Sequence, residues 1–97
     1  MAEATALNNR EAAHAVLTDA IRALTRFKDK ENHSMRVLKT KYEAVVAAKE
    51  ELMAKHFVYA EKAKKPLNSP ELVQWLTPKM DDADDVIDEV FLLLEED

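Results

Sequence analysis

The sequence predicts an all-α fold, an antiparallel three-helix bundle with a long central helix and a Pro-kinked third helix. The 97 residues include no glycine and only three prolines, and a chain with so few turn-forming residues is best explained by a few long helices. Apolar residues recur every three or four positions through residues 34–65, which is the period of an amphipathic helix. Polar residues 28–34 and the proline-containing residues 64–71 separate this helix from one helix on each side.

Residues 3–28 are predicted to form the first helix, because their apolar residues fall mostly on one face. That set is Ala4, Leu7, Ala13, Val16, Leu17, Ala20, Ile21, Leu24 and Phe27. The polar stretch KDKENHS at 28–34 then predicts a turn, since Asp29, Asn32 and Ser34 favour turns and caps.

One continuous helix across this turn is the alternative, because the heptad phase does not change there. Two rows of residues lie seven apart: Leu17, Leu24, Glu31, Leu38, Val45, Leu52 and Tyr59, and Ile21, Lys28, Met35, Tyr42, Lys49 and His56. A break is favoured, because Glu31 and Lys28 would put two charged residues in a continuous apolar seam.

Residues 34–65 are predicted to be the longest helix and the middle of the bundle. One apolar seam consists of Met35, Leu38, Tyr42, Val45, Leu52 and Tyr59, and a second lies beside it with Val46, Met53, Phe57 and Ala60. Together they form an arc too wide for one neighbouring helix. Glu51–Lys55 and Glu61–Lys65 are correctly ordered i,i+4 ion pairs for the solvated face.

Pro66 predicts that the central helix ends at or before Lys65. The third helix is predicted over residues 69–95, with the Ser69 hydroxyl as N-cap, Pro70 at the first helical position and Glu71 in the first turn. Thr77-Pro78 either kinks this helix or caps a new one. Apolar residues take one face and acidic residues take the other.

Charge and composition narrow the function. Residues 1–77 hold 13 Lys/Arg and ten Asp/Glu, a charge of +3, whereas residues 78–97 hold one lysine and nine acids, a charge of −8. The acidic last helix is expected to pack against the more basic helices before it and argues against nucleic-acid binding. The absence of cysteine fits an intracellular, cytoplasmic protein, and no apolar run exceeds five residues, so no membrane span is expected.

No stretch predicts catalysis, a cofactor or a metal. The run DDADDVIDE at 81–89 lacks the glycine turn and final bidentate acid of a calcium loop, and is interpreted as a solvated face. His14, His33 and His56 lack ligand spacing, and there is no glycine loop to bind phosphate or line an oxyanion hole. We therefore expect no enzyme. The possible partner contacts are the aromatic residues and histidine of the seams and the kink, with the alternative that they are core: Tyr42, His56, Tyr59 and Trp75.

Three stretches carry a resemblance: LTRFKDKENH from residue 24, LKTKYEAVVAAKEELMAKHFVYAEKA, and LVQWLTPKMDDADDVIDEVFLLL, which ends at residue 94. Together they resemble the N-terminal helical, gag-like region of Pao/BEL-type retrotransposon polyproteins and their invertebrate relics, over about 70 of the 97 residues. The resemblance implies a helical assembly module at the start of a longer polyprotein. The chain lacks the basic or zinc-knuckle segments of RNA-binding gag regions.

The sequence thus predicts one helical domain over residues 1–97, a fragment of a longer chain, that acts as a non-enzymatic protein–protein interaction or self-assembly domain. Its partner would be another protein or a second copy of itself. The alternative is a monomeric adaptor bundle, of a vesicle-trafficking or regulatory type, that holds a partner's amphipathic helix in a groove. A weaker idea is contact with nucleic acid or anionic lipid through the basic residues Arg36, Lys39, Lys41 and Lys62–Lys65.

Overall fold

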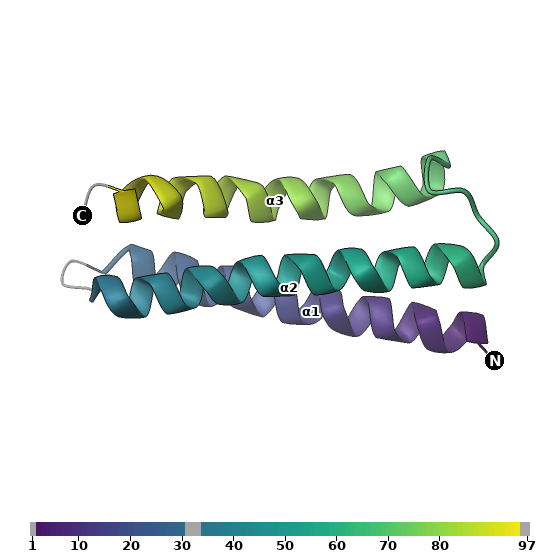
Figure 1. Cartoon of the computed structure of the whole chain (residues 1–97), viewed down its shortest axis with the longest axis horizontal. Coiled ribbons are helices and arrows are strands. Elements are labelled where there is room, and N and C mark those ends of the chain that lie inside the picture. Colours follow the sequence, from purple (N-terminus) through teal and green to yellow (C-terminus); the bar gives the residue numbers. More distant parts are fainter. Residues whose placement is uncertain (1, 31–33, 96–97) are drawn as a thin grey trace.

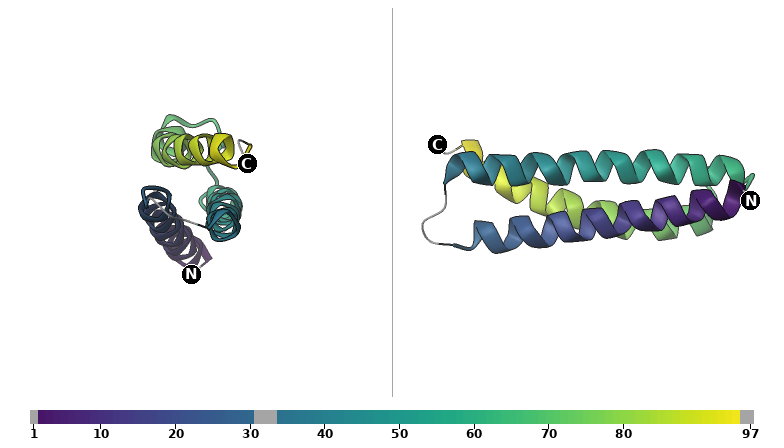
Figure 2. Two further views of the ribbon diagram at one scale, coloured as in Figure 1. Left: turned by 90° about the vertical axis from the view of Figure 1, so that its left-hand side faces the viewer. Right: turned by 90° about the horizontal axis from the view of Figure 1, so that it is seen from below.

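The computed structural model describes residues 2–30 and 34–95 and confirms the predicted fold class. Three helices run up, down and up as α1 (Ala2–Lys28), α2 (Met35–Lys62) and α3 (Pro70–Glu95), side by side in a rod about 48 Å long (Figure 1). The described part of the chain contains no strand. α2 packs most closely on α1, and α3 lies across both (Figure 2).

The core follows the first heptad row. Leu17, Leu24, Leu38, Val45 and Leu52 are at most 1% exposed, and Tyr59 is 7% exposed. The same seven-residue spacing therefore marks buried positions in both α1 and α2, although the two helices are antiparallel. The continuous-helix alternative is wrong: α1 ends at Lys28, and Ser34 caps α2 by accepting a hydrogen bond from the Val37 amide at 3.4 Å. Glu31 lies outside the described residues.

α2 ends three residues earlier than predicted, at Lys62. Lys64 takes a left-handed conformation with φ of 58°, and the Lys65 and Lys64 amides donate to the carbonyl oxygens of Ala60 and Glu61 at 2.9 and 3.1 Å. This is the Schellman arrangement, in which the left-handed position is usually glycine. Because the chain has no glycine, a lysine occupies the left-handed position. With this earlier end, α2 has 28 residues and is only one residue longer than α1.

α3 begins at Pro70 and continues as one helix through Pro78, so Pro78 does not cap a new helix. Pro78 has no N–H, which leaves the carbonyl of Gln74 without its helical donor. The predicted hydroxyl cap is wrong: Ser69 Oγ is buried without a hydrogen-bond partner among the described residues. The fixed φ of Pro70 favours the start of the helix instead.

Ion pairs join the acidic α3 to the basic residues of the other two helices, as predicted. Lys28 donates to Glu89 at 2.6 Å, and Lys49 pairs with Asp84. Glu51 and Lys55 form the predicted intrahelical pair at 3.4 Å. The predicted Glu61–Lys65 pair is wrong, because Lys65 lies beyond the end of α2 and pairs with Glu71 at 2.7 Å. Among the described residues, no helix has the length and apolar character needed to cross a bilayer.

Candidate functional site

The most unusual side chains meet at the end of the bundle where α1 begins and α2 ends. We call this group the Trp75 cluster; it takes two residues from each helix: Arg10 and His14 from α1, His56 and Tyr59 from α2, and Trp75 and Lys79 from α3. Arg10 lies one heptad before Leu17 and therefore points into the core, where it is only 6% exposed. His56 belongs to the second heptad row and is 2% exposed.

The Trp75 indole has basic groups on several sides. The Arg10 guanidinium carbon lies 3.8 Å from the indole centroid and 4.1 Å from the Tyr59 ring centroid. The His56 ring stacks parallel to the indole at 5.5 Å, and His14 approaches edge-on at 5.8 Å. Lys79 Nζ is 4.2 Å from the indole centroid and donates to the Trp75 carbonyl at 2.9 Å. Such cation–π contacts are stronger where water is excluded.

The protonation state of His56 follows from its neighbour. Arg10 Nη1 lies 3.4 Å from His56 Nδ1, and because a guanidinium can only donate, this hydrogen bond requires a neutral His56 ring that accepts at Nδ1 and carries its proton on Nε2. Burial lowers the pKa of His56, and the charge of Arg10 lowers it further. Burial also lowers the pKa of His14, with a further contribution from Lys79.

Arg10 itself is poorly compensated. Its Nε is buried and has no hydrogen-bond partner among the described residues. The Glu11 carboxylate lies 3.7 Å from Arg10 Nη2, and its side chain is half exposed. A buried charge with so little pairing costs free energy. The contacts that Arg10 makes are chiefly with the aromatic rings of Tyr59 and Trp75.

Of the four predicted contact residues, the structure brings together His56, Tyr59 and Trp75 and places Tyr42 elsewhere. Tyr42 is half-buried in a groove at the opposite end of the bundle. Trp75 is also half-buried, whereas His56 and Tyr59 are buried. Contact with a partner stays a prediction for all four, and Tyr42 and Trp75 are the two that keep accessible surface. His33 lies outside the described residues.

Arg10, His14 and Lys79 were not among the predicted contact residues. The signal for Arg10 was present, because counting the heptad row back from Leu17 reaches it. His14 shares a helical face with Arg10, four residues away. Lys79 lies four residues after Trp75 on the same helix, so its i,i+4 spacing was a sequence signal for this contact.

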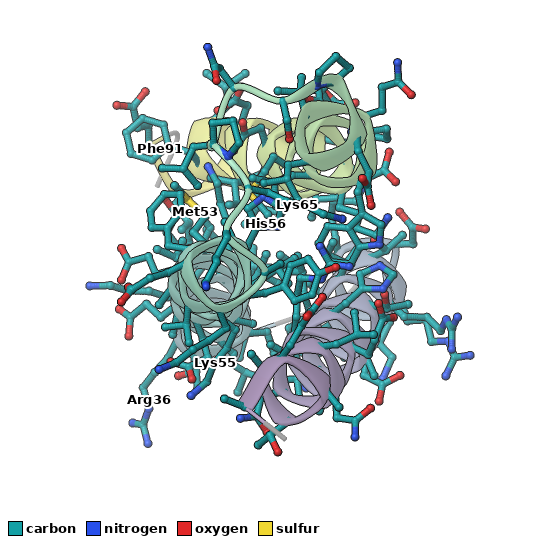
Figure 3. All side chains as sticks on the ribbon, turned by 90° about the vertical axis from the view of Figure 1, so that its right-hand side faces the viewer. Arg36, Met53, Lys55, His56, Lys65 and Phe91 are labelled. Atoms are coloured by element: carbon teal, nitrogen blue, oxygen red, sulfur yellow. The ribbon has the colours of Figure 1, made fainter. Side chains whose placement is uncertain are left out.

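A second feature is an apolar surface where α2 and α3 meet, here called the α2–α3 strip. Its members are Val46, Met53 and Phe57 of α2 and Val73 and Phe91 of α3. Phe57, Val73 and Phe91 are 45%, 45% and 47% exposed. Val73 and Phe91 are five helical turns apart and share a face, and Figure 3 shows Met53 and Phe91 on the same side of the bundle. Val46, Met53 and Phe57 are three of the four residues of the predicted second seam, and the other two helices leave them partly exposed. The fourth, Ala60, is 2% exposed and belongs to the core.

The strip continues into a groove of ≈ 590 Å³ between the start of α2 and the end of α3. Tyr42, Phe91 and Leu94 line it, with basic Arg36 and Lys39 on the α2 side and acidic Glu95 on the α3 side.

A groove of ≈ 500 Å³ lies on the other side of α3, between α3 and α1. Its apolar residues are Ile21 and Val86. Its walls carry opposite charges, with Arg22 and Arg26 on α1 and Asp82 and Asp85 on α3.

The acidic run of α3 lies largely on the solvated face, as interpreted from the sequence. Four of its aspartates are exposed: Asp81, Asp82, Asp85 and Asp88. Asp84 forms an ion pair with Lys49. Among residues 2–30 and 34–95, no three His, Cys, Asp or Glu side chains are grouped so as to hold a metal ion. Comparison of the chain with family models, with curated proteins and with solved structures finds no match.

Proposed function

We propose that this chain is a non-enzymatic protein–protein interaction domain that assembles with a second copy of itself through the α2–α3 strip. The observation that carries the proposal is the set of half-exposed aromatic and aliphatic side chains along one face. Phe57 and Phe91, at 45% and 47% exposed, are typical of the side chains that anchor interfaces, and scattered single apolar residues would not form a continuous face.

The size of this face suits a stable dimer. α3 has 26 residues and is therefore about 39 Å long, and two adjacent helices span about 20 Å. The product is the projected area of the whole α2–α3 face, and it is close to the ~800 Å² that each partner buries in a typical specific interface, so a dimer of that size uses both helices along most of their length.

The charges beside the strip favour a second copy over an unrelated partner. The start of α2 is basic at Arg36 and Lys39, and the end of α3 is acidic at Asp88 and Glu95. A twofold axis along the bundle would set α2 of one copy against α3 of the other at the same height. Each basic end would then face an acidic end, twice per dimer. A role in assembly also fits the resemblance to gag-like regions.

Light scattering coupled to size-exclusion chromatography, at 10 to several hundred micromolar chain, tests the proposal. We expect a dimer whose dissociation constant rises at least about tenfold in Phe57→Glu and Phe91→Glu, because each places a charge in the apolar interface. Leu92→Glu is the matched control: Leu92 is 60% exposed and lies next to Phe91 but on the opposite side of α3 from the core, so this variant should remain dimeric. A strict monomer at the highest concentration would contradict the proposal.

The groove between α1 and α3 favours a second candidate, a monomeric adaptor that binds a partner's amphipathic helix. The opposite charges of Arg22 and Arg26 and of Asp82 and Asp85 suit a helix with acids along one edge and bases along the other. The same experiment separates the two: the adaptor stays monomeric, and neither Phe57→Glu nor Phe91→Glu changes its mass.

A further inference from the structure

Protonation of the Trp75 cluster would bring together charges that the bundle has little means to neutralise. Arg10 and Lys79 are already cationic, and His14 and His56 lie against the same indole. Two further charges would put four cationic groups around one side chain.

His56 is the most sensitive position, because its interaction with Arg10 exists in one protonation state only. The neutral Nδ1 accepts from Arg10 Nη1 at 3.4 Å. A proton on Nδ1 turns this contact into two donors that face each other, removes the hydrogen bond and adds charge repulsion. With 2% exposure, the imidazolium could not be solvated in place.

Each helix contributes ionisable groups near the cluster, and few of them are acidic. α1 contributes Arg10, His14 and Glu11, whose carboxylate is 3.7 Å from Arg10 and half exposed. On the α2 side are the Tyr59 hydroxyl and Lys65, whose Nζ lies 5.9 Å from the Tyr59 ring centroid and is paired with Glu71 at 2.7 Å. α3 contributes Lys79 and Glu71. Glu11 is thus the one carboxylate in these contacts that is not engaged by a lysine.

The segment that would separate from the bundle when the cluster takes up protons is the start of α3. Trp75 and Leu72 are its buried or half-buried anchors against α1 and α2. Pro78 follows directly and removes one hydrogen bond of the helix, so residues 70–77 are coupled less tightly to the rest of α3 than a regular helical turn would be.

We propose that the Trp75 cluster is a proton-operated latch: while His14 and His56 are neutral it holds residues 70–77 against α1 and α2, and when both take up a proton in mild acid it releases that segment. The latch belongs to the single chain and does not rest on the proposed self-assembly.

The direction of the pH effect follows from linkage. The pKa values of His14 and His56 are lowered below 6.5 in the folded chain, so the released or unfolded chain binds more protons. The closed latch is therefore fully stable above about pH 6.5 and loses stability as the pH falls through that value toward the folded pKa values.

Hydrogen exchange of the full chain at pH 7.5 and pH 5.0 tests the latch, with the emission of Trp75, the single tryptophan, as a second readout. We expect amide protection factors in residues 70–77 to fall at least about tenfold at pH 5.0 while α1 and α2 stay protected, and the Trp75 emission to shift to longer wavelength. Unchanged protection at pH 5.0, or an equal loss in all three helices, would overturn the proposal.

Variants show whether the histidines are responsible. The double substitution His14→Gln and His56→Gln keeps polar side chains but cannot take up a proton, so its protection should not change between the two pH values. His33→Gln is the control, because His33 is the third histidine of the sequence and is not a member of the Trp75 cluster, and it should respond as the wild type does. A double variant with the wild-type pH response contradicts the latch.

A titration of the unmodified chain covers the case in which the double variant does not fold. Nuclear magnetic resonance should show the His14 and His56 rings taking up protons below pH 6.5 together with a change in the Trp75 indole resonance. Histidines that titrate while the indole resonance is unchanged would also overturn the proposal.

Discussion

At the scale of single residues, two positions carry chemistry that their neighbours would not suggest. Arg10 occupies a core position of the heptad row in which Leu17 and Leu24 follow. The heptad row reaches this position seven residues before Leu17, but it does not show what compensates a charge there, which comes from the rings of Tyr59 and Trp75 on the other two helices. The pairing between helices depends on the packed fold, so the cluster could not be read from local sequence.

Lys64 is the second such position, and its left-handed conformation leads to a stability prediction. A non-glycine residue with φ near 58° is strained, and glycine is free of that strain. We expect Lys64→Gly to raise the free energy of unfolding by about 1 kcal/mol, measured by urea denaturation.

The matched control for this change is Lys62→Gly, which removes the same charge from the last turn of α2. There the backbone is right-handed and helical, so glycine should lower the free energy of unfolding by about 0.5–1 kcal/mol. If both substitutions shift stability in the same direction, the strain at Lys64 is not the cause.

At the scale of the helices, their number and order could be predicted, because periodicity and breaks in it are local properties. Most of the buried positions followed too, but Val16, counted on the apolar face of the first helix, is 59% exposed. The ends were less predictable. Pro66 predicted that α2 ends at or before Lys65, but the actual end at Lys62, three residues before Lys65, is set by a Schellman turn without glycine. Ser69 correctly predicted where α3 begins. The predicted hydrogen bond from its hydroxyl group to the helix is wrong, since Oγ makes no hydrogen bond among the described residues.

Pro78 gives a prediction at this scale. It lies inside α3 and its side chain is exposed, so Pro78→Ala restores a helical N–H for the Gln74 carbonyl and creates no cavity. Interior proline costs a helix about 3 kcal/mol, part of which the bundle has already accommodated. We expect Pro78→Ala to stabilise the chain by about 1–2 kcal/mol, which corresponds to a rise in Tm of roughly 4–16 °C.

Pro70→Ala is the comparison that makes this result specific. Pro70 is the first residue of α3, where proline lacks only an N–H that the helix does not use. That variant should be neutral or slightly less stable by calorimetry, and an equal gain from both substitutions would argue against a backbone effect at Pro78.

At the scale of the whole molecule, charge is distributed by helix. Within the described residues, the acids of α3 meet lysines of the other helices at Lys28–Glu89 and Lys49–Asp84. The carboxylates of these pairs are about half exposed, at 58% and 47%, and pairs open to solvent each contribute only about 0.2–1 kcal/mol, so the apolar core holds the bundle together and the charges chiefly select which faces meet. The sequence predicted this segregation, but it could not reveal that α1 and α3 leave Val46, Met53 and Phe57 of the second seam partly exposed while Ala60 is buried.

The same segregation predicts how two copies recognise each other. Reversing the basic end of α2 with Arg36→Glu and Lys39→Glu makes both ends of the proposed interface acidic, and reversing the α3 end with Asp88→Lys and Glu95→Lys makes both basic. Each double variant alone should dimerise at least about tenfold more weakly than the wild type, a change of about 1.4 kcal/mol. Mixed together, the two should form a heterodimer, because every reversed end then faces its opposite.

Light scattering of each variant and of the mixture measures this, with circular dichroism to show that each remains helical. Two variants that stay monomeric when mixed would exclude the twofold arrangement along the bundle, whereas recovery of the dimer only in the mixture would support it.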